Sequence, residues 1–221
     1  MPAPTDRRRA RLLDAIRAAG VADERVLAAL ATLPREAFIP DSALHARAYD
    51  DAALPIGEGQ TISQPSTVAY MTALLDVRPD ERILEIGTGS GYQAAVLCAL
   101  GARVFSVERH ASLLRRTEGV LARLGYRVRT RLGDGTRGWP AYAPFDGILV
   151  TAGGAEAPPD LLAQLREPRE GRPDARMIIP LGGRAQQTLY RITRIGAGDG
   201  PEAFRYEPLA PVRFVPLVSG A

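Results

Sequence analysis

Several residue types that mark common protein classes are scarce in this chain. Cys98 is the single cysteine among 221 residues, so no internal disulfide can form. We expect a buried structural thiol in a reducing cytoplasm. The chain has no lysine, and all of its basic residues apart from two histidines are arginines. His45 and His110 do not have the spacing of metal ligands, so we expect no metal site.

Aromatic residues and long apolar runs are scarce as well. Aromatics make up 6% of the chain and are not interleaved with basic runs, although the net charge is +3. We therefore expect no nucleic-acid partner and interpret the arginines at 7–11 as a solvated helix face. No apolar run approaches the roughly 20 residues that span a bilayer, and the N-terminus lacks the apolar core of a secretory signal. We therefore expect no membrane association.

The most informative stretch covers residues 82–92, with the sequence RILEIGTGSGY. Its apolar run predicts a buried strand, its three alternate glycines predict a tight turn, and residues 93–100 predict a helix. Such a strand–turn–helix begins a nucleotide-binding α/β unit. Gly91 comes one residue too early for the G-x-G-x-x-G pattern of dinucleotide sites, which disfavours an NAD-dependent dehydrogenase.

A second strand, predicted over residues 103–108, ends in an acid. Glu108 follows the first glycine at the offset of about 20 residues that is expected for a carboxylate that binds ribose hydroxyls. A carboxylate can accept two hydrogen bonds and so hold a vicinal diol in one orientation. The alternative interpretation is a solvated acid at a strand end.

The remaining pattern predicts an α/β domain that begins with helices. Two helices are predicted within 5–33, separated by Gly20, with Asp23 as the cap of the second, and an extended segment follows at 34–40. Further predictions are a helix at 111–124, strands at 127–132, 145–150, 187–195 and 204–215, and a polar loop at 166–174. We expect one domain over 1–221, in which 1–66 form a helical cap with an active-site loop. Residues 67–221 then form the cofactor-binding α/β core with the C-terminal strands.

Residues 57–66 combine glycines with polar side chains. Gly57 and Gly59 predict a flexible loop that could act as a lid. Pro65 predicts the start of a helix, which places Ser63 close to a helix N-terminus. Backbone amides there favour an anion, such as an acidic group of a substrate, and a plain helix cap is an equally good interpretation.

The motifs of the chain, taken together, resemble those of the protein-L-isoaspartate O-methyltransferases, a family of class I S-adenosylmethionine-dependent methyltransferases. The most specific motif is LPIGxGQTISQP at 54–65. Further matches follow in order at 34–40, 83–91, 107–109, 133–140, 145–152, 179–182 and 212–217. The chain departs from the family pattern at 166–174, at 153–155 and at Ala53. We expect these departures to lie near the mouth of the site and to affect substrate preference rather than the reaction.

The resemblance implies a fold, a cofactor and a set of site residues. The implied fold is a Rossmann-like α/β methyltransferase fold, with a mostly parallel central sheet, helices on both faces and an N-terminal helical cap. The implied cofactor is S-adenosyl-L-methionine, with S-adenosyl-L-homocysteine as its product. Ser63 is the implied catalytic residue, in contact with the reacting carboxylate. The implied cofactor-binding residues are Gln60, Thr61, Ile62, Glu85, Gly87, Gly89, Ser90, Gly91, Glu108, Arg109, Asp134 and Gly135.

The implied reaction is methyl transfer to the free α-carboxylate of L-isoaspartyl residues in damaged proteins and peptides, which initiates repair through a succinimide. A carboxylate has an ordinary pKa of about 4, so it is already ionised at neutral pH and needs no strong general base. Two alternatives stay open: a methyltransferase for aspartate in a dedicated peptide, and a non-catalytic module that binds S-adenosylmethionine. We expect a cytoplasmic monomer whose partners are isoaspartyl-containing proteins and peptides.

Overall fold

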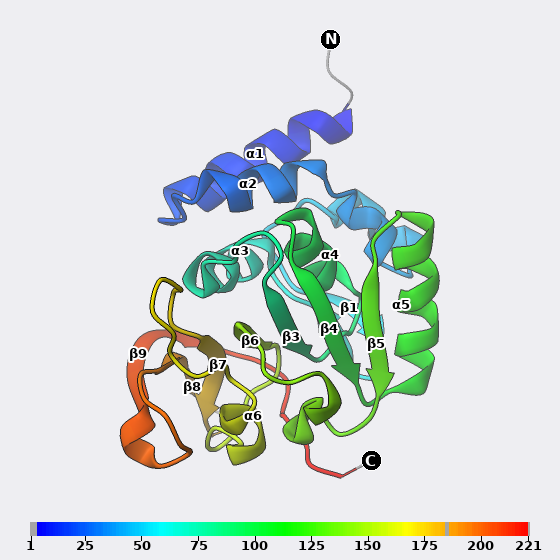
Figure 1. The fold of residues 1–221 in the computed structure, drawn as a ribbon. Helices are drawn as coiled ribbons and strands as arrows, with labels where there is room; N and C mark the ends of the chain where they lie inside the picture. Colours follow the sequence, from blue (N-terminus) through cyan, green and yellow to red (C-terminus); the bar gives the residue numbers. More distant parts are fainter. Residues whose placement is uncertain (1–3, 184–185, 221) are drawn as a thin grey trace.

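A seven-stranded sheet forms the centre of the molecule in the computed structural model, which describes residues 4–183 and 186–220 (Figure 1). The strand order is β5-β4-β3-β6-β7-β8-β9. These strands are β3 (Arg82–Ile86), β4 (Arg103–Glu108), β5 (Val128–Leu132), β6 (Gly147–Val150), β7 (Arg176–Gly182), β8 (Gln187–Arg194) and β9 (Phe204–Val212). The pairs from β5 to β7 are parallel, and the pairs β7–β8 and β8–β9 are antiparallel. The prediction of a mostly parallel sheet is confirmed.

Both faces of the central strands are covered, which explains their continuous apolar sequences. On one face, Ile83 and Leu149 belong to a buried cluster that also holds residues of α3 (Pro65–Leu75) and α4 (Tyr92–Ala99). On the other face, Leu84 and Ile148 pack in a cluster with α6 (Pro159–Ala163). Helix α5 (Ala111–Arg123) packs beside β4 and β5 (Figure 1). The prediction of helices on both faces is therefore confirmed.

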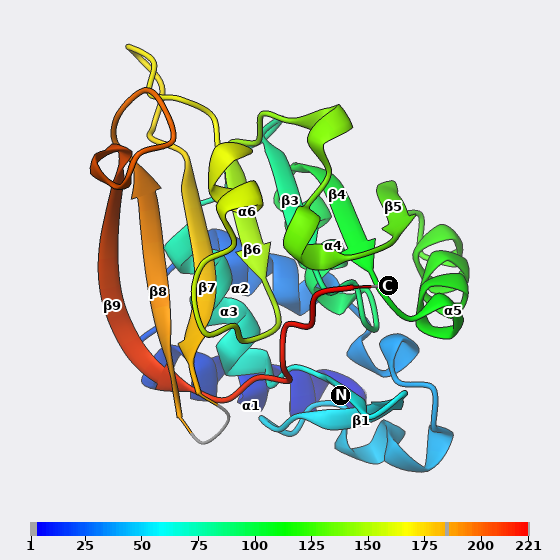
Figure 2. The ribbon, with the colours of Figure 1, turned by 90° about the horizontal axis from the view of Figure 1, so that it is seen from below.

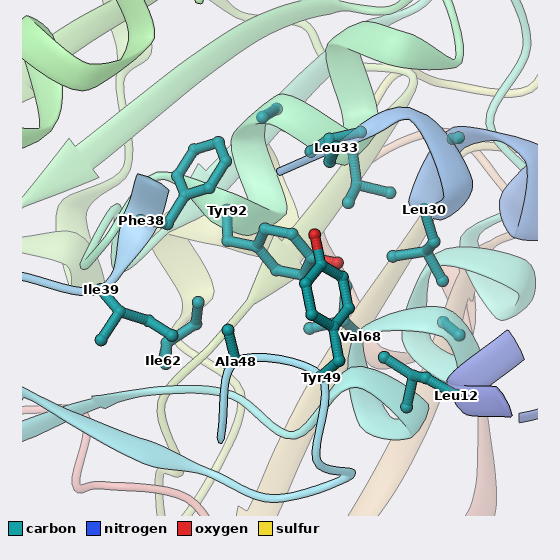
Figure 3. Close-up of a cluster of buried hydrophobic side chains, with 14 of the residues drawn as sticks. Leu12, Leu30, Leu33, Phe38, Ile39, Ala48, Tyr49, Ile62, Val68 and Tyr92 are labelled. Atoms are coloured by element: carbon teal, nitrogen blue, oxygen red, sulfur yellow. The ribbon is translucent and has the colours of Figure 1, made fainter. Parts of the chain in front are cut away.

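The N-terminal segment packs over this core as α1 (Pro4–Ala18), α2 (Glu24–Thr32) and two short 3-10 helices, η1 (Arg35–Phe38) and η2 (Ser42–Arg47). Asp23 caps α2 as predicted, since its carboxylate accepts a hydrogen bond from the backbone N–H of Arg25 at 2.9 Å. Figure 3 shows side chains of this segment, such as Leu12, Leu30 and Phe38, in one buried cluster with Tyr92 of α4, and Phe38 lies beside the Tyr92 ring. The division into 1–66 and 67–221 stays a prediction, and its boundary falls inside the first turn of α3.

Two local predictions are wrong. Residues 34–40 are not extended, because η1 turns the chain so that Arg35 and Phe38 become buried. The predicted flexible loop around Gly57 is a hairpin of β1 (Leu54–Gly57) and β2 (Gln60–Ile62). Glu58 and Gly59 have φ angles of 52° and 66°, and positive φ at both central residues is the geometry that closes a two-residue hairpin turn.

Residues 166–174 form a loop as predicted, but the loop does not lie where we expected it. It precedes β7 and lies at the edge where the parallel strands begin, whereas the hairpin and the C-terminal segment lie at the edge where those strands end (Figure 2). Arg166 fixes the loop there, because its Nε donates to Asp146 Oδ1 at 2.7 Å and both side chains are 6% exposed. The loop is therefore far from the site that we predicted it would border.

Two minor predictions are only partly confirmed. Cys98 is half-buried rather than fully buried, and burial raises the pKa of its thiol to about 12. The arginines at 7–11 are not a purely solvated face, since Arg9 donates to the hydroxyl of Tyr49 at 2.8 Å. No helix in the described ranges is long and apolar enough to cross a bilayer.

Candidate active site

The glycine turn after β3 lies at the point where the strand order reverses, which is where open α/β sheets bind their ligands. Gly87 has a φ of 93° and donates its N–H to the carbonyl of Val107 at 2.9 Å. A Cβ at Gly87 would lie 2.4 Å from Thr151 Oγ1, so no larger residue fits without a shift. The absence of side chains leaves the backbone of this turn open to a ligand.

Glu108, at the end of β4, is held by the same turn. Its Oε2 accepts from the N–H of Gly89 at 2.8 Å, and its Oε1 accepts from the N–H of His110 at 2.9 Å. Each carboxylate oxygen has further lone pairs, so both can still accept hydrogen bonds from a diol. Only 4% of Glu108 is exposed, and the exposed part faces a cavity.

This cavity, here called the cofactor cavity, has a volume of about 300 Å³. That lies at the lower end of the range for small-molecule sites. Its lining includes ten of the predicted site residues: Gln60, Thr61, Ile62, Ser63, Gly87, Gly89, Ser90, Glu108, Arg109 and Gly135. The structure therefore brings together residues that are up to 75 positions apart in the chain. Their contacts with a bound cofactor stay predictions.

Three predicted cofactor-binding residues do not line the cofactor cavity. Gly91 begins α4 instead, where a Cβ would lie 2.6 Å from Thr117 Cγ2 on α5. Asp134 caps the 3-10 helix η3 (Gly135–Arg137), and its Oδ2 accepts from the N–H of Gly220 at 2.7 Å. Burial alone would raise the pKa of Asp134, but these hydrogen bonds outweigh it and lower the pKa.

Glu85 is the third of these residues, and it lies beneath the glycine turn with an exposed fraction of 0%. Ser106, its register partner on β4, donates to Glu85 Oε2 at 2.5 Å. Ser106 Oγ also lies 2.6 Å from Oγ1 of Thr88, which lines the cofactor cavity. Desolvation raises the pKa of Glu85 to about 8, which favours the protonated form of its carboxyl at neutral pH.

A larger open cleft, with a volume of about 1480 Å³, adjoins the cofactor cavity. Its lining includes Ala53, Gly153, Gly154 and Ala155, so two of the three departures from the family pattern lie at the site as predicted. Both hollows share six lining residues, which are Thr61, Ser63, Thr151, Val215, Pro216 and Leu217. Ser63 therefore stands between the two hollows.

The structure excludes the interpretation of Ser63 as the cap of α3, while its contact with a substrate anion stays a prediction. The residue that caps α3 is Gln64, and the first free amide, on Ser66, donates to Asp51 Oδ1 at 2.8 Å. Ser63 is therefore not the cap of α3. Within residues 4–183 and 186–220, its hydroxyl makes no hydrogen bond to another protein group, which leaves it available to a ligand.

The C-terminal segment 215–218 lines the cofactor cavity, although it was not among the predicted site residues. Gly153 N–H donates to Val215 O at 2.8 Å, and Leu217 N–H donates to Gly153 O at 2.8 Å. This pairing carries the segment across the ends of β3 and β6 (Figure 2). Its apolar side chains resemble those of a strand, and the match to the family pattern at 212–217 was the one signal that could have placed it at the site.

The fold and this site define a class I methyltransferase. Its features are the glycine turn at the switch point, an acid at the end of the next strand along the chain, and the antiparallel strand β8 near the end of the sheet. The model of the protein-L-isoaspartate (D-aspartate) O-methyltransferase family matches residues 7–221. The chain belongs to this family.

Individual relatives agree with the family match over nearly their whole length. A protein-L-isoaspartate O-methyltransferase of Salinibacter ruber is 60% identical over 212 residues, which cover 95% of this chain and 91% of the relative. One from Aliivibrio fischeri is 50% identical over 214 residues, covering 96% and 97%.

Two solved structures show the same fold. A protein-L-isoaspartate O-methyltransferase superposes with a TM-score of 0.83 at 28% identity, covering 96% of this chain and 66% of the other. A Plasmodium falciparum structure, described as a β-aspartate methyltransferase in complex with S-adenosyl-L-homocysteine, has a TM-score of 0.79 at 23% identity, covering 95% and 98%.

Proposed function

We propose that this chain transfers a methyl group from S-adenosyl-L-methionine to the free α-carboxylate of L-isoaspartyl residues, and that Ser63 is the residue that orients this carboxylate. The enzyme is an S-adenosylmethionine-dependent protein carboxyl O-methyltransferase that acts in protein repair. The position of Ser63 between the two hollows is the observation that carries the assignment of its role. A methyl donor in one hollow and a peptide in the other would meet at this residue.

The residues of the cofactor cavity fit S-adenosylmethionine. Glu108 offers two carboxylate oxygens to a ribose diol, and the glycine turn offers unobstructed backbone. Gln60, Thr61 and Ile62 of β2 form the wall beside Ser63. The cofactor supplies a methyl group on a positively charged sulfur, which is an activated leaving group.

The protein has little proton transfer to perform in this reaction, because the attacking carboxylate is already ionised at neutral pH. The Ser63 hydroxyl donates one hydrogen bond to one carboxylate oxygen and leaves the other oxygen free to attack. A single neutral donor orients the nucleophile without neutralising its charge. Apolar side chains of Val215, Pro216 and Leu217, which line both hollows, exclude water from their meeting point. Rate enhancement then comes mainly from alignment.

The open cleft fits an extended peptide better than a folded surface, because small residues form much of its lining. Gly153, Gly154, Gly182 and Gly183 leave room for a peptide backbone. We propose that the active enzyme is a monomer. We further propose a cytoplasmic enzyme whose partners are damaged proteins and peptides, and light scattering at working concentration tests the monomer.

The substrate assignment is tested with two peptides that differ only in aspartate or isoaspartate at one position. We expect labelled methyl to pass from S-adenosylmethionine to the isoaspartyl peptide and not to the aspartyl peptide. Methylation of the aspartyl peptide would instead favour a dedicated aspartyl substrate. Cofactor binding without methylation of either peptide would favour a non-catalytic module.

Ser63→Ala tests the role of the hydroxyl. We expect kcat on the isoaspartyl peptide to fall about tenfold, as for loss of one hydrogen bond of about 1.4 kcal/mol. Cofactor affinity, measured by titration calorimetry, should change less than twofold, because the backbone of residue 63 remains in place. Ser112→Ala is the matched control, since Ser112 bonds Glu58 on the outside of the hairpin. An unchanged kcat in Ser63→Ala would remove the catalytic assignment.

A further inference from the structure

Arg35 is completely buried, although arginine is one of the residues least often found inside proteins. Its exposed fraction is 0%, and it lies in η1 under the N-terminal helices. Burial lowers the pKa of its guanidinium, but arginine stays protonated inside proteins. A full positive charge therefore lies within the N-terminal cluster, and such a charge is costly unless its hydrogen bonds are satisfied.

The guanidinium of Arg35 joins two chain segments, the turn at 48–52 and the end of the hairpin, through three backbone carbonyls. Its Nη1 donates to Ala48 O, and its Nη2 donates to Ala52 O and to Ser63 O, each at 3.0 Å. Within the described part of the chain, its Nε has no hydrogen-bond partner. The sequence separation between Arg35 and Ser63 is 28 residues, so this contact is a product of the tertiary fold.

The hydrogen bond from Arg35 fixes the backbone of Ser63, the residue that directly follows the β1–β2 hairpin. The ladder between β1 and β2 ends with the pair Leu54 and Ile62, so Ser63 lies just outside it. Its carbonyl is held by Arg35 from the buried side, and its side chain borders both hollows. The orientation of the Ser63 backbone therefore depends on Arg35.

Arg35 also contacts a lining residue of the cofactor cavity and the chain neighbour of a lining residue of the open cleft. Its Cζ lies 5.7 Å from the ring centroid of Tyr92, a residue at the start of α4 that is among those lining the cofactor cavity. Ala52, which accepts from Nη2, precedes Ala53 in the lining of the open cleft. A single side chain thus links Ser63 to Tyr92 at the cofactor cavity and to Ala52 beside the open cleft.

We propose that Arg35 is a positioning residue, which holds the Ser63 carbonyl so that the Ser63 hydroxyl points at the reacting carboxylate. This inference rests on the proposed role of Ser63. A guanidinium suits the task because its planar fork presents donors to several acceptors in fixed directions. A lysine ammonium carries all its donors on one nitrogen and cannot reproduce that geometry.

A double-mutant cycle of Arg35→Gln and Ser63→Ala tests the proposal. In the Ser63 background, we expect Arg35→Gln to lower kcat about tenfold, while the calorimetric Kd for S-adenosylmethionine changes less than twofold. In the Ser63→Ala background, the same substitution should lower kcat less than twofold, because the group that it positions is already gone. An equal loss in both backgrounds means that Arg35 serves the fold alone, and it overturns the proposal.

Arg194→Gln is the matched control. Arg194 is 3% exposed and also donates to backbone carbonyls, including that of Leu165 at 2.6 Å, but it lies on β8 beside the start of β7. We expect Arg194→Gln to lower the melting temperature and to leave kcat unchanged. Should Arg35→Gln not fold, Arg35→Lys retains the charge and enters the same cycle with the same two outcomes.

The cycle separates this inference from the function on which it rests. A wild-type enzyme that does not methylate the isoaspartyl peptide removes the proposed function. A Ser63→Ala variant with wild-type kcat removes the role of Ser63, and with it that of Arg35. An impaired Ser63→Ala variant beside a fully active Arg35→Gln variant overturns the role of Arg35 alone.

Discussion

At the scale of single residues, Glu85 shows that the burial of a carboxyl group, and not its position in the sequence, determines its protonation. Its sequence position, at the end of β3, suggests a carboxylate that faces a ligand. In the fold, Ser106 and the start of α4 close over it, and desolvation raises the pKa of Glu85 to about 8. A neutral carboxyl under the glycine turn would keep a second negative charge away from Glu108.

This state predicts a pH dependence of stability. The folded pKa of Glu85 lies above its ordinary value of 4.5, so the folded state binds the proton more tightly than the unfolded state does. Its contribution to stability is therefore complete below pH 4.5 and is lost as the pH rises through 8. Between pH 5 and pH 8 the loss is on the order of 3 kcal/mol.

Glu85→Gln should remove this slope, because glutamine does not ionise. Denaturant unfolding from pH 5 to pH 9 would show the stability of the wild type falling relative to that of Glu85→Gln as the pH rises. Glu170→Gln, at an exposed position of the 166–174 loop, should follow the wild-type curve. A constant difference between wild type and Glu85→Gln over this range would show that Glu85 is ionised in the folded protein.

At the scale of elements, the turn after β3 requires glycine at position 87 for two reasons, its backbone conformation and the lack of space for a side chain. Gly87 has a positive φ, and a Cβ there would also meet Thr151 Oγ1. Thr151 cannot move freely, because its hydroxyl donates to the carbonyls of Ile86 and Gly87 at 2.9 Å. The turn and the end of β6 are therefore one rigid unit at the site.

Gly87→Ala should consequently impair cofactor binding as well as stability. We expect a stability loss of about 2 kcal/mol from backbone strain and the shift of Thr151. We also expect at least a tenfold weaker Kd for S-adenosylmethionine in titration calorimetry. Gly125→Ala isolates the strain, since Gly125 has a φ of 78° and open space where a Cβ would lie. Equal cofactor affinity in the two variants would show that the turn does not shape the cofactor site.

Local patterns predicted most of these elements, and tertiary contacts account for the failures. The strand before Gly87 was predictable from its own apolar run, and the position of Glu108 at the site from its spacing after the first glycine. Both signals lie in short stretches of the sequence. The acceptors of Arg35 are carbonyls of Ala48, Ala52 and Ser63, and no side-chain pattern marks a carbonyl as an acceptor. The hairpin was missed because glycines predict freedom of φ equally well for a loop and for a tight turn.

At the scale of the whole molecule, the site lies at the end of the sheet where the parallel strands finish, and a structural ion-pair network lies at the opposite end, where they begin. Ser63, the glycine turn and the C-terminal segment gather where the parallel strands end (Figure 2). At the opposite edge, Asp146 accepts from Arg82 N–H at 3.0 Å and from Arg166 and Arg172, which ties the start of β3 to the 166–174 loop. The long loop is thus a structural feature, although the sequence suggested a neighbour of the substrate.

Arg166→Met tests this division between the edges. Removal of one partner from a buried pair leaves Asp146 partly uncompensated, which should cost about 3 kcal/mol and lower the melting temperature by about 10 °C. At a temperature where the variant is folded, kcat and KM for the isoaspartyl peptide should stay within twofold of wild type, because the pair lies at the far edge. Arg17→Met, which breaks an exposed pair with Glu24, should leave the melting temperature nearly unchanged. A several-fold change in KM for Arg166→Met would instead mean that the two edges are coupled through β6, the strand that lies between Asp146 and Thr151 in the chain.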